Sequence, residues 1–153
     1  MTAADDTMMK AFNMTSEGAI AENGEPLDLE AEIYTISSNQ VDSVAVGGDD
    51  KKAYVYRVEE KDDGTLRLAS DGDKELAMCF DSPVMKLEYH PGGKLLGVSQ
   101  DSHVQILDTE TSKVTSYSKS AHEGSVRNAA IDPHLEFLST TGCDGMLKIT
   151  KIA

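Results

Sequence analysis

An aspartate placed between two alternating strands recurs three times along the chain. Asp50, Asp101 and Asp144 superpose when "SVAVGGDDKKAYVYR", "KLLGVSQDSHVQILD" and "FLSTTGCDGMLKITK" are aligned. The intervals between them are 51 and 43 residues, and the residue six positions after each aspartate lies near the end of an alternating strand. A tight turn held by an acidic side chain is therefore a repeated element, which restricts the fold to one built from similar units.

The units are predicted to consist of short β-strands, because period-two alternation recurs between Gly, Pro, Asp and Ser clusters and no long stretch has a helical period. Eleven such runs are expected to be strands: IYTIS, VDSVAVG, AYVYRV, LRLAS, VMKLEY, KLLGVS, VQILD, VTSYS, VRNAAID, EFLSTT and LKITKI. A period in the forties with four short strands per unit is typical of β-propeller blades. The predicted fold class is all-β, with three antiparallel four-stranded blades of an incomplete propeller at about residues 32–80, 81–118 and 119–153.

The charge is strongly negative, with a net value of −13, and two segments carry most of it. Residues 1–30 hold seven acids and one base, and residues 59–75 hold seven acids and three bases. The first segment is expected to be a disordered or linker segment, with residues 31–153 forming the partial propeller. The alternative is that "LDLEAEIYTIS" supplies a strand to a preceding sheet. Direct nucleic-acid binding by this chain is disfavoured, because such affinity comes chiefly from Lys and Arg on phosphates.

Cofactor, metal and membrane sites are not expected. The two cysteines, Cys79 and Cys143, lie far apart and in no CxxC pattern, so neither a disulfide framework nor a metal knuckle is predicted. No apolar run approaches the roughly 20 residues that a membrane-spanning helix needs. The N-terminus has acids where a signal peptide has bases, which favours a reducing compartment, either nucleus or cytoplasm.

The third unit resembles a WD-repeat blade. The family has a Gly-His pair before the innermost strand, a Ser or Thr on the second strand, an Asp in the next turn and a Trp-Asp ending. Here "AHEGSVRNAAIDPHLEFLSTTGCDGMLKITKI" offers His122, Thr140 and Asp144, with Thr150 where Trp is usual. The resemblance implies a buried structural hydrogen-bond chain of His122, Thr140 and Asp144, with Asp101 and Asp50 as its counterparts in the other blades.

A narrower resemblance rests on the runs "VQILD" and "IDPHLEFLSTTGCDG". These resemble the N-terminal propeller of the WD-repeat and HMG-box DNA-binding proteins, a family of replisome adaptors. The resemblance implies a non-enzymatic protein-interaction scaffold in the nucleus, associated with chromatin and with DNA-replication proteins. The alternatives are a generic cytosolic WD-repeat scaffold in another complex and a propeller-based hydrolase.

The hydrolase alternative depends on His122 together with Thr140 and Asp144. Nucleophilic catalysis needs an exposed hydroxyl beside an oxyanion hole, whereas a blade places these groups between sheets. No catalytic residue is therefore predicted, and the remaining histidines have no paired spacing that would suggest zinc.

Partner contacts are expected on the loops that precede the inner strands, because rigid loops on a sheet scaffold lose little entropy on binding. The predicted contact residues are Asp81, Ser82, Lys86, Ser120, Glu123 and Arg127. Three blades do not close a ring, so open strand edges and apolar blade faces are also expected to meet other proteins. The interpretations left open are a truncated product, a ring completed by another copy or protein, and an open stack.

Overall fold

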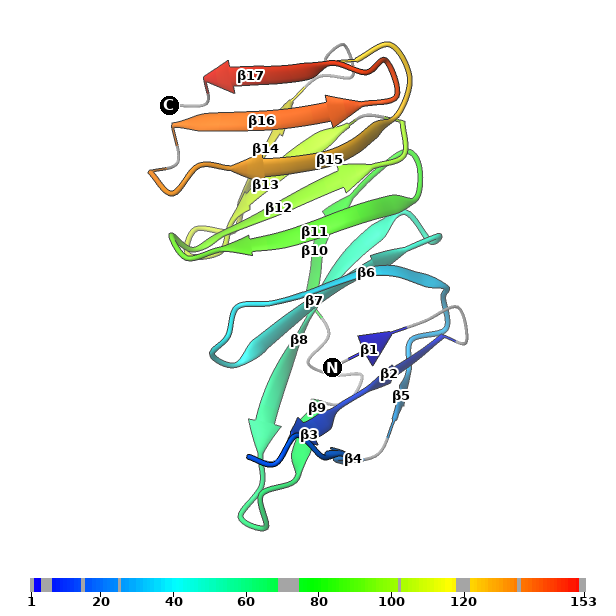
Figure 1. Ribbon diagram of the computed structural model, residues 1–153, viewed down its shortest axis with the longest axis vertical. Coiled ribbons are helices and arrows are strands. Elements are labelled where there is room, and N and C mark those ends of the chain that lie inside the picture. The colour runs from blue at the N-terminus through cyan, green and yellow to red at the C-terminus, as the bar shows by residue number, and fades with distance from the viewer. Residues whose placement is uncertain are drawn as a thin grey trace.

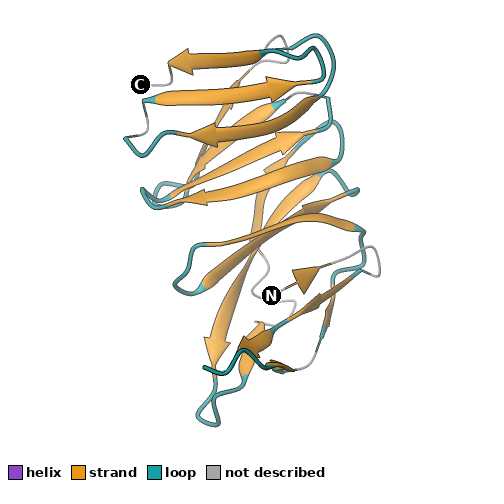
Figure 2. Cartoon of the chain, in the orientation of Figure 1, coloured by secondary structure: helices purple, strands orange, loops and turns teal. Residues whose placement is uncertain are grey.

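The structure, a computed structural model, describes residues 2–3, 7–14, 16–24, 26–68, 75–101, 103–117, 122–134 and 136–151. Every regular element in these ranges is a β-strand (Figure 2). The described part of the chain contains no helix that is long and apolar enough to cross a membrane.

Three antiparallel sheets follow one another along the chain. The first contains β6 (Ile33–Ser38), β7 (Ser43–Gly48), β8 (Lys52–Glu60), β9 (Leu66–Leu68) and β10 (Glu75–Cys79). The second contains β11 (Val84–His90), β12 (Lys94–Ser99), β13 (Val104–Asp108) and β14 (Lys113–Tyr117). The third contains β15 (Val126–Ile131), β16 (Phe137–Gly142) and β17 (Leu147–Lys151).

The three sheets stack face to face along the long axis of the molecule, with β17 at one end (Figure 1). Each follows the same path, in which the first strand pairs with the second and the second with the third. This confirms the predicted all-β fold class of blades in an incomplete propeller. The described sheets form an open stack and do not close into a ring.

The fourth strand of the first sheet differs from expectation. The sequence predicts a strand at "LRLAS", where β9 lies, but the strand that continues the main sheet beside β8 is β10. The eleven expected strands do not include β10. Its register with β8 shifts between Leu76 and Met78, and this bulge breaks the period-two alternation that marks a strand in a sequence.

The N-terminal segment also differs from the expected disordered or linker segment. Its described residues form β1 (Thr2–Ala3), β2 (Met8–Lys10), β3 (Phe12–Met14), β4 (Ile20–Glu22) and β5 (Leu27–Asp28). Strands β1, β2 and β5 make a small sheet. The buried side chains of Met9 on β2 and of Leu29, directly after β5, pack against Val44, Val46 and Tyr56 of the first large sheet. A few apolar side chains in an acidic segment are enough to hold it against an apolar sheet face.

Two further apolar layers hold the large sheets together. Between the first and second sheets, Ala45, Ala53 and Met78 pack against Val84 and Leu95. Between the second and third sheets, the core comprises Leu96, Val98, Val104, Ile106, Val126, Ala129 and Leu138. Each sheet contacts its neighbours in sequence, so stability is expected to divide between adjacent interfaces, as in repeat proteins.

Backbone hydrogen bonds to side chains add specific links between the first two sheets. The N–H of Leu87 donates to Thr35 Oγ1 at 2.9 Å, and the N–H of Tyr89 donates to Ser37 Oγ at 3.0 Å. These bonds join β11 to β6, so the innermost strands of neighbouring sheets are held at a defined offset.

Candidate functional site

The turn between β16 and β17 contributes to a polar trio of two buried residues and one partly exposed aspartate. Asp144 and Gly145 form this turn, where Gly145 has φ of 72°, a value that a glycine adopts without steric cost. His122 lies in the segment before β15, and its side chain is fully buried. With Nδ1 protonated, the ring donates to Asp144 Oδ1 at 2.9 Å, and the hydroxyl of Thr140 donates to Nε2 at 2.9 Å.

Backbone groups complete the surroundings of Asp144. The N–H of Glu123 donates to Oδ2 and the N–H of Met146 donates to Oδ1, each at 3.1 Å. Burial opposes ionisation of this carboxyl, but the hydrogen bonds from His122, Met146 and Glu123 outweigh it and lower its pKa to about 2. The trio therefore ties the segment before β15 to the β16–β17 turn as a charged, internally satisfied link.

The trio has the residue types of a hydrolytic triad but not its accessibility. Thr140 is buried, and both ring nitrogens of His122 are occupied by internal partners. A substrate carbonyl has no approach to the hydroxyl in this arrangement. Its geometry supports a structural role for these three residues.

The backbone of Gly142 lies close to the His122 ring, and the ring fits there because glycine has no side chain. A Cβ atom at Gly142 would lie 2.6 Å from Cγ of the ring, which is closer than real Cβ contacts. The equivalent position in the second sheet is Ser99, whose hydroxyl donates to Asp101 at 2.6 Å. A glycine two residues before the turn aspartate is a sequence signal that could have been used to identify this site.

Asp101 occupies the corresponding turn in the second sheet with different partners. The hydroxyls of Ser82 and Ser99 donate to its Oδ1 at 2.8 and 2.6 Å, and its own N–H donates to Ser82 Oγ at 3.0 Å. Two serines thus perform the linking role that His122 has in the third sheet.

In the first sheet, Asp50 accepts a hydrogen bond from the N–H of Lys52 at 3.1 Å. Burial, and then the hydrogen bond with Asp50, raise the pKa of Tyr54 to about 12. The three aspartates therefore lie at the same place in successive sheets, but each has a different set of partners.

The residues expected to contact partners divide into two groups. Ser82 and Lys86 have internal roles: Ser82 binds Asp101, and Lys86 Nζ donates to the carbonyl of Ala129 at 2.9 Å and also contacts Asn128 and Glu88. Lys86 lies on β11, and its side chain points toward the third sheet. It therefore links two sheets of this chain, and does not lie on a loop where a partner could contact it.

The other predicted contact residues lie at the surface where the structure describes them. Asp81 and Glu123 are exposed, and the exposed Arg127 donates through Nε to Cys143 Sγ at 2.9 Å. Ser120 lies outside the described residues. Glu123 and Arg127 therefore retain a surface position beside the β16–β17 turn, and Asp81 does so beside Asp101.

The open face of the third sheet is a further candidate site. Leu147 and Ile149 on β17 are 62% and 67% exposed, although their equivalents on β13, Val104 and Ile106, are 2% and 8% exposed. The equivalence follows from matching registers, because β16 pairs with β17 as β12 pairs with β13. In the second sheet, these apolar positions are buried against the third sheet. In the third sheet, the same positions lie on a face that no described strand covers.

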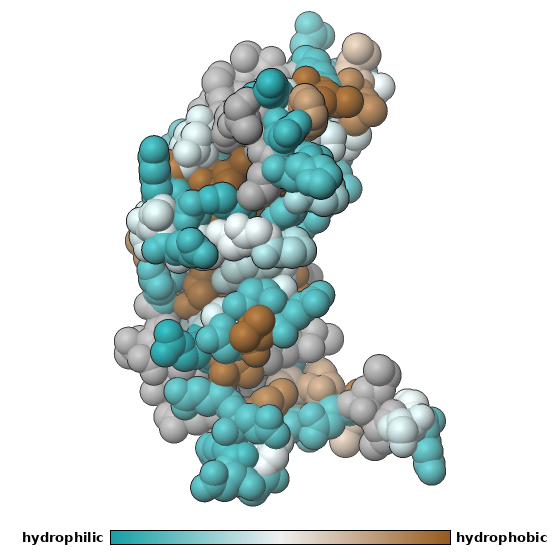
Figure 3. Space-filling model, turned by 90° about the vertical axis from the view of Figure 1, so that its left-hand side faces the viewer, coloured by the Kyte–Doolittle hydropathy of each residue, from teal (hydrophilic) through white to brown (hydrophobic). Residues whose placement is uncertain are grey.

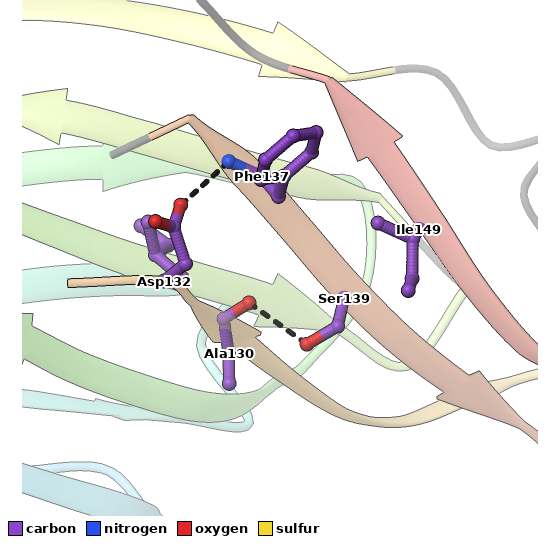
Figure 4. Close-up of a pocket in the computed structure, with 6 residues that line it drawn as sticks. Ala130, Asp132, Phe137, Ser139 and Ile149 are labelled. Carbon is purple, nitrogen blue, oxygen red and sulfur yellow. Dashed lines mark hydrogen bonds between the residues drawn. The ribbon is translucent and has the colours of Figure 1, made fainter. Parts of the chain in front are cut away.

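A shallow hollow of about 530 Å³ lies on this open face. Figure 4 shows lining residues from all three strands, with the Ser139 hydroxyl donating to the carbonyl of Ala130 at 3.2 Å. Of these residues, Phe137 and Ile149 have exposed side chains. The side chain of Asp132 stays at the turn, where it accepts from the N–H of Phe137. The space-filling view shows apolar surface at this end of the stack (Figure 3).

The residues of this face were not identified individually from the sequence, although open blade faces were expected in general. The signal was present, because Leu147 and Ile149 each follow the turn aspartate at the same spacing as Val104 and Ile106. Only the structure shows that the second pair is covered and the first is not. Among the described residues, no group of three or more His, Cys, Asp or Glu side chains is arranged to hold a metal ion.

Comparison with known proteins supports the repeat. Residues 112–150 match the WD40 family, described as WD domain, G-beta repeat. Over 96 residues the chain is 28% identical to Regulatory-associated protein of TOR 1 from Arabidopsis thaliana, and the match covers 57% of this chain. The same match covers 7% of that protein, so the chain corresponds to a small part of its length.

The WD40 match runs from the start of β14 to the end region of β17, and it includes His122, Thr140 and Asp144. The resemblance to WD-repeat proteins therefore has support from a family match as well as from the fold. The narrower resemblance to replisome adaptors receives no support from these comparisons.

Acid should weaken the link made by Asp144. The pKa of this carboxyl is about 2 in the folded chain, below its ordinary value of 3.8, so the unfolded state binds more protons in that interval. The stabilisation is present above about pH 4 and is lost as the pH falls through about 2. Urea unfolding between pH 6 and pH 2 should show the difference in stability between wild type and Asp144→Asn shrinking with acid; a constant difference would contradict the assignment.

Proposed function

We propose that the chain is a non-enzymatic protein-interaction scaffold that docks another protein on the open face of its third sheet. The observation that carries this proposal is the exposure of Leu147 and Ile149, at positions whose equivalents in the second sheet are buried by a neighbouring sheet. Covering these side chains would remove apolar surface from water, which is the main driving force of association.

Two features of the fold support a scaffold. The sheets are linked by buried cores and by hydrogen bonds such as those from Leu87 to Thr35 and from Lys86 to Ala129, so the face is presented by a preorganised framework. A rigid surface loses little conformational entropy when a partner binds. Glu123 and Arg127 lie at the turn end of the same sheet and would form a polar rim to the contact.

The identity of the partner is a separate proposal. The match to a protein named as a regulatory-associated protein of TOR favours a role in a regulatory complex. The replisome-adaptor role, with replication proteins as partners and a nuclear location, remains a prediction from the sequence resemblance, with a cytoplasmic scaffold as its alternative. Docking on the open face is compatible with either complex.

The test compares matched substitutions of exposed apolar residues. Ile149→Glu on the open face and Val41→Glu at a distant turn both introduce one charge at an exposed site. Proximity labelling in cells, followed by crosslinking of the enriched partner to purified protein, should lose the partner with Ile149→Glu and retain it with Val41→Glu. An identical partner list for wild type and Ile149→Glu would remove the open face as the docking surface.

Loop variants separate the two candidate surfaces. Glu123→Ala and Arg127→Ala should weaken partner crosslinking only modestly, because exposed rim charges contribute little to affinity. Complete loss of the partner with these variants, and none with Ile149→Glu, would assign docking to the loops.

A further inference from the structure

The outer edge of β17 lacks a partner strand among the described residues. The equivalent third strands of the other two sheets, β8 and β13, pair along that edge with β10 and β14. An unpaired edge presents backbone donors and acceptors that can bind an extended segment of another chain.

The hydrogen-bonding groups at this edge can be identified from the ladder. The N–H of Gly142 donates to the carbonyl of Met146, and bonded pairs alternate along an antiparallel ladder. Lys148 and Thr150 therefore direct their backbone groups to β16, whereas Leu147, Ile149 and Lys151 direct theirs to the open edge. In β13 the equivalent residues Val104, Ile106 and Asp108 lie opposite residues of β14.

The side chains at this edge specify the kind of strand that fits. Leu147, Ile149 and Lys151 alternate along β17 and so share the open face. In the second sheet, the position of Lys151 is held by Asp108, which lies opposite Lys113 of β14 in the register and forms its ion pair with Lys94 of β12. The charge at this position is reversed in β17, so an acidic residue is complementary to it, with apolar residues opposite Ile149 and Leu147.

We propose that β17 binds an extended segment of a partner protein as an antiparallel fourth strand, in which an acidic residue lies opposite Lys151 and apolar residues lie opposite Ile149 and Leu147. This inference rests on the proposed scaffold function and names the chemistry of the partner. Its sequence pattern is an acidic residue followed by apolar residues two and four positions later.

The position of the acidic segments is compatible with an acidic ligand despite the net charge of −13. The described parts of residues 1–30 and residues 59–68 lie toward the other end of the stack, where β2 to β5 and the β8–β9 hairpin are found (Figure 1). Residues 122–151 carry four acids and three bases and are therefore nearly neutral. At physiological salt, charges separated by more than about 8 Å are largely screened.

A second copy of the chain fits this end less well. Two β17 edges related by a two-fold axis at Ile149 would place each Lys151 opposite Leu147 of the other copy, without a charge partner. Stacking by the open faces is also less favourable than stacking within the chain, because Ser139 and Thr141 replace the apolar Leu96 and Val98 of the second sheet. A partner strand with an acidic residue would pair with the backbone groups of this edge and also with the charge of Lys151.

The probe is a fluorescein-labelled peptide that copies residues 111–117 with Lys113→Glu and Thr115→Ile, titrated with the full chain by anisotropy. Saturable binding is expected. Lys151→Glu should weaken it about fivefold, since cross-strand charge pairs contribute modestly and like charges repel. A peptide that keeps Lys113 should show the opposite preference, binding Lys151→Glu more tightly than wild type.

Lys148→Glu is the matched control, because this lysine lies on the same strand but on the other face. The Lys148→Glu variant should bind the peptide with unchanged affinity. Its thermal midpoint is measured first, to show that the variant is folded. N-methylation of the peptide at the residue opposite Ile149 should abolish binding, since that N–H donates to the Ile149 carbonyl.

The proposal is overturned by any of three results: no saturable binding of the acidic peptide, equal weakening by Lys148→Glu and Lys151→Glu, or undiminished binding of the N-methylated peptide. Light scattering that shows the full chain as a dimer at the titration concentrations would instead assign the edge to a second copy. If the peptide does not bind while Ile149→Glu still removes the cellular partner, docking on the face stands and strand addition fails.

Discussion

Leu96→Ala is expected to lower the free energy of unfolding by about 2–5 kcal/mol, the range typical of removing a buried leucine side chain. Leu96 is buried in the core that joins the second and third sheets, beside Ile106, Ala129 and Leu138. The cavity left by the substitution would lie between rigid sheets that relax only partly. Urea unfolding, with the slope compared between variants, measures the change.

The control for this prediction is Ile149→Ala, which removes apolar atoms from the equivalent layer of the third sheet. Ile149 is exposed, so its replacement is expected to change stability by no more than about 0.5 kcal/mol. Equal losses for the two variants would mean that the second and third sheets do not share a core, and the stacked arrangement would be wrong.

His122→Ala and Gly142→Ser are expected to be strongly coupled. Removing the imidazole takes its ring partner from the buried Thr140 hydroxyl and leaves Asp144 with only the backbone donors of Glu123 and Met146, which should cost roughly 1–3 kcal/mol. Gly142→Ser places a Cβ atom within 2.6 Å of the ring, so the imidazole must move and break both hydrogen bonds, at a cost of about 1–3 kcal/mol.

The double variant should be more stable than the sum of the two losses predicts. With the imidazole absent, the new serine has space and can donate to Asp144, as Ser99 donates to Asp101 at 2.6 Å in the second sheet. A double-mutant cycle by urea unfolding measures this coupling. Strictly additive losses would show that Gly142 does not act by making room for the ring.

The repeated strands were predictable because their signals are local. Alternation of apolar and polar residues predicts a half-buried strand from a few neighbouring residues, and the Asp144-Gly145 pair predicts a turn from backbone preferences alone. The resemblance of the third unit to a WD-repeat blade also pointed to His122 and Thr140, which the structure places within hydrogen-bonding distance of each other beside Asp144.

The functional surface was less predictable because it depends on which segments meet. Ser82 and Lys86 have the polar character of contact residues, but the pairing of distant strands gives them internal partners. Leu147 and Ile149 have the same pattern as Val104 and Ile106, and an amino-acid pattern does not record whether another sheet lies above it. Exposure is a property of the assembled sheets.

The sequence by itself determined the all-β character and the repeated turn aspartates, because backbone preferences and strand alternation act over short distances. The residues of the polar trio came from the resemblance of the third unit to a WD-repeat blade. Only the tertiary structure decided that β10 continues the first sheet and that Met9 and Leu29 anchor the acidic N-terminal segment to that sheet. It also decided that the apolar face of the third sheet stays open. Burial depends on long-range packing, so the same alternation of side chains is buried in the second sheet and exposed to solvent in the third.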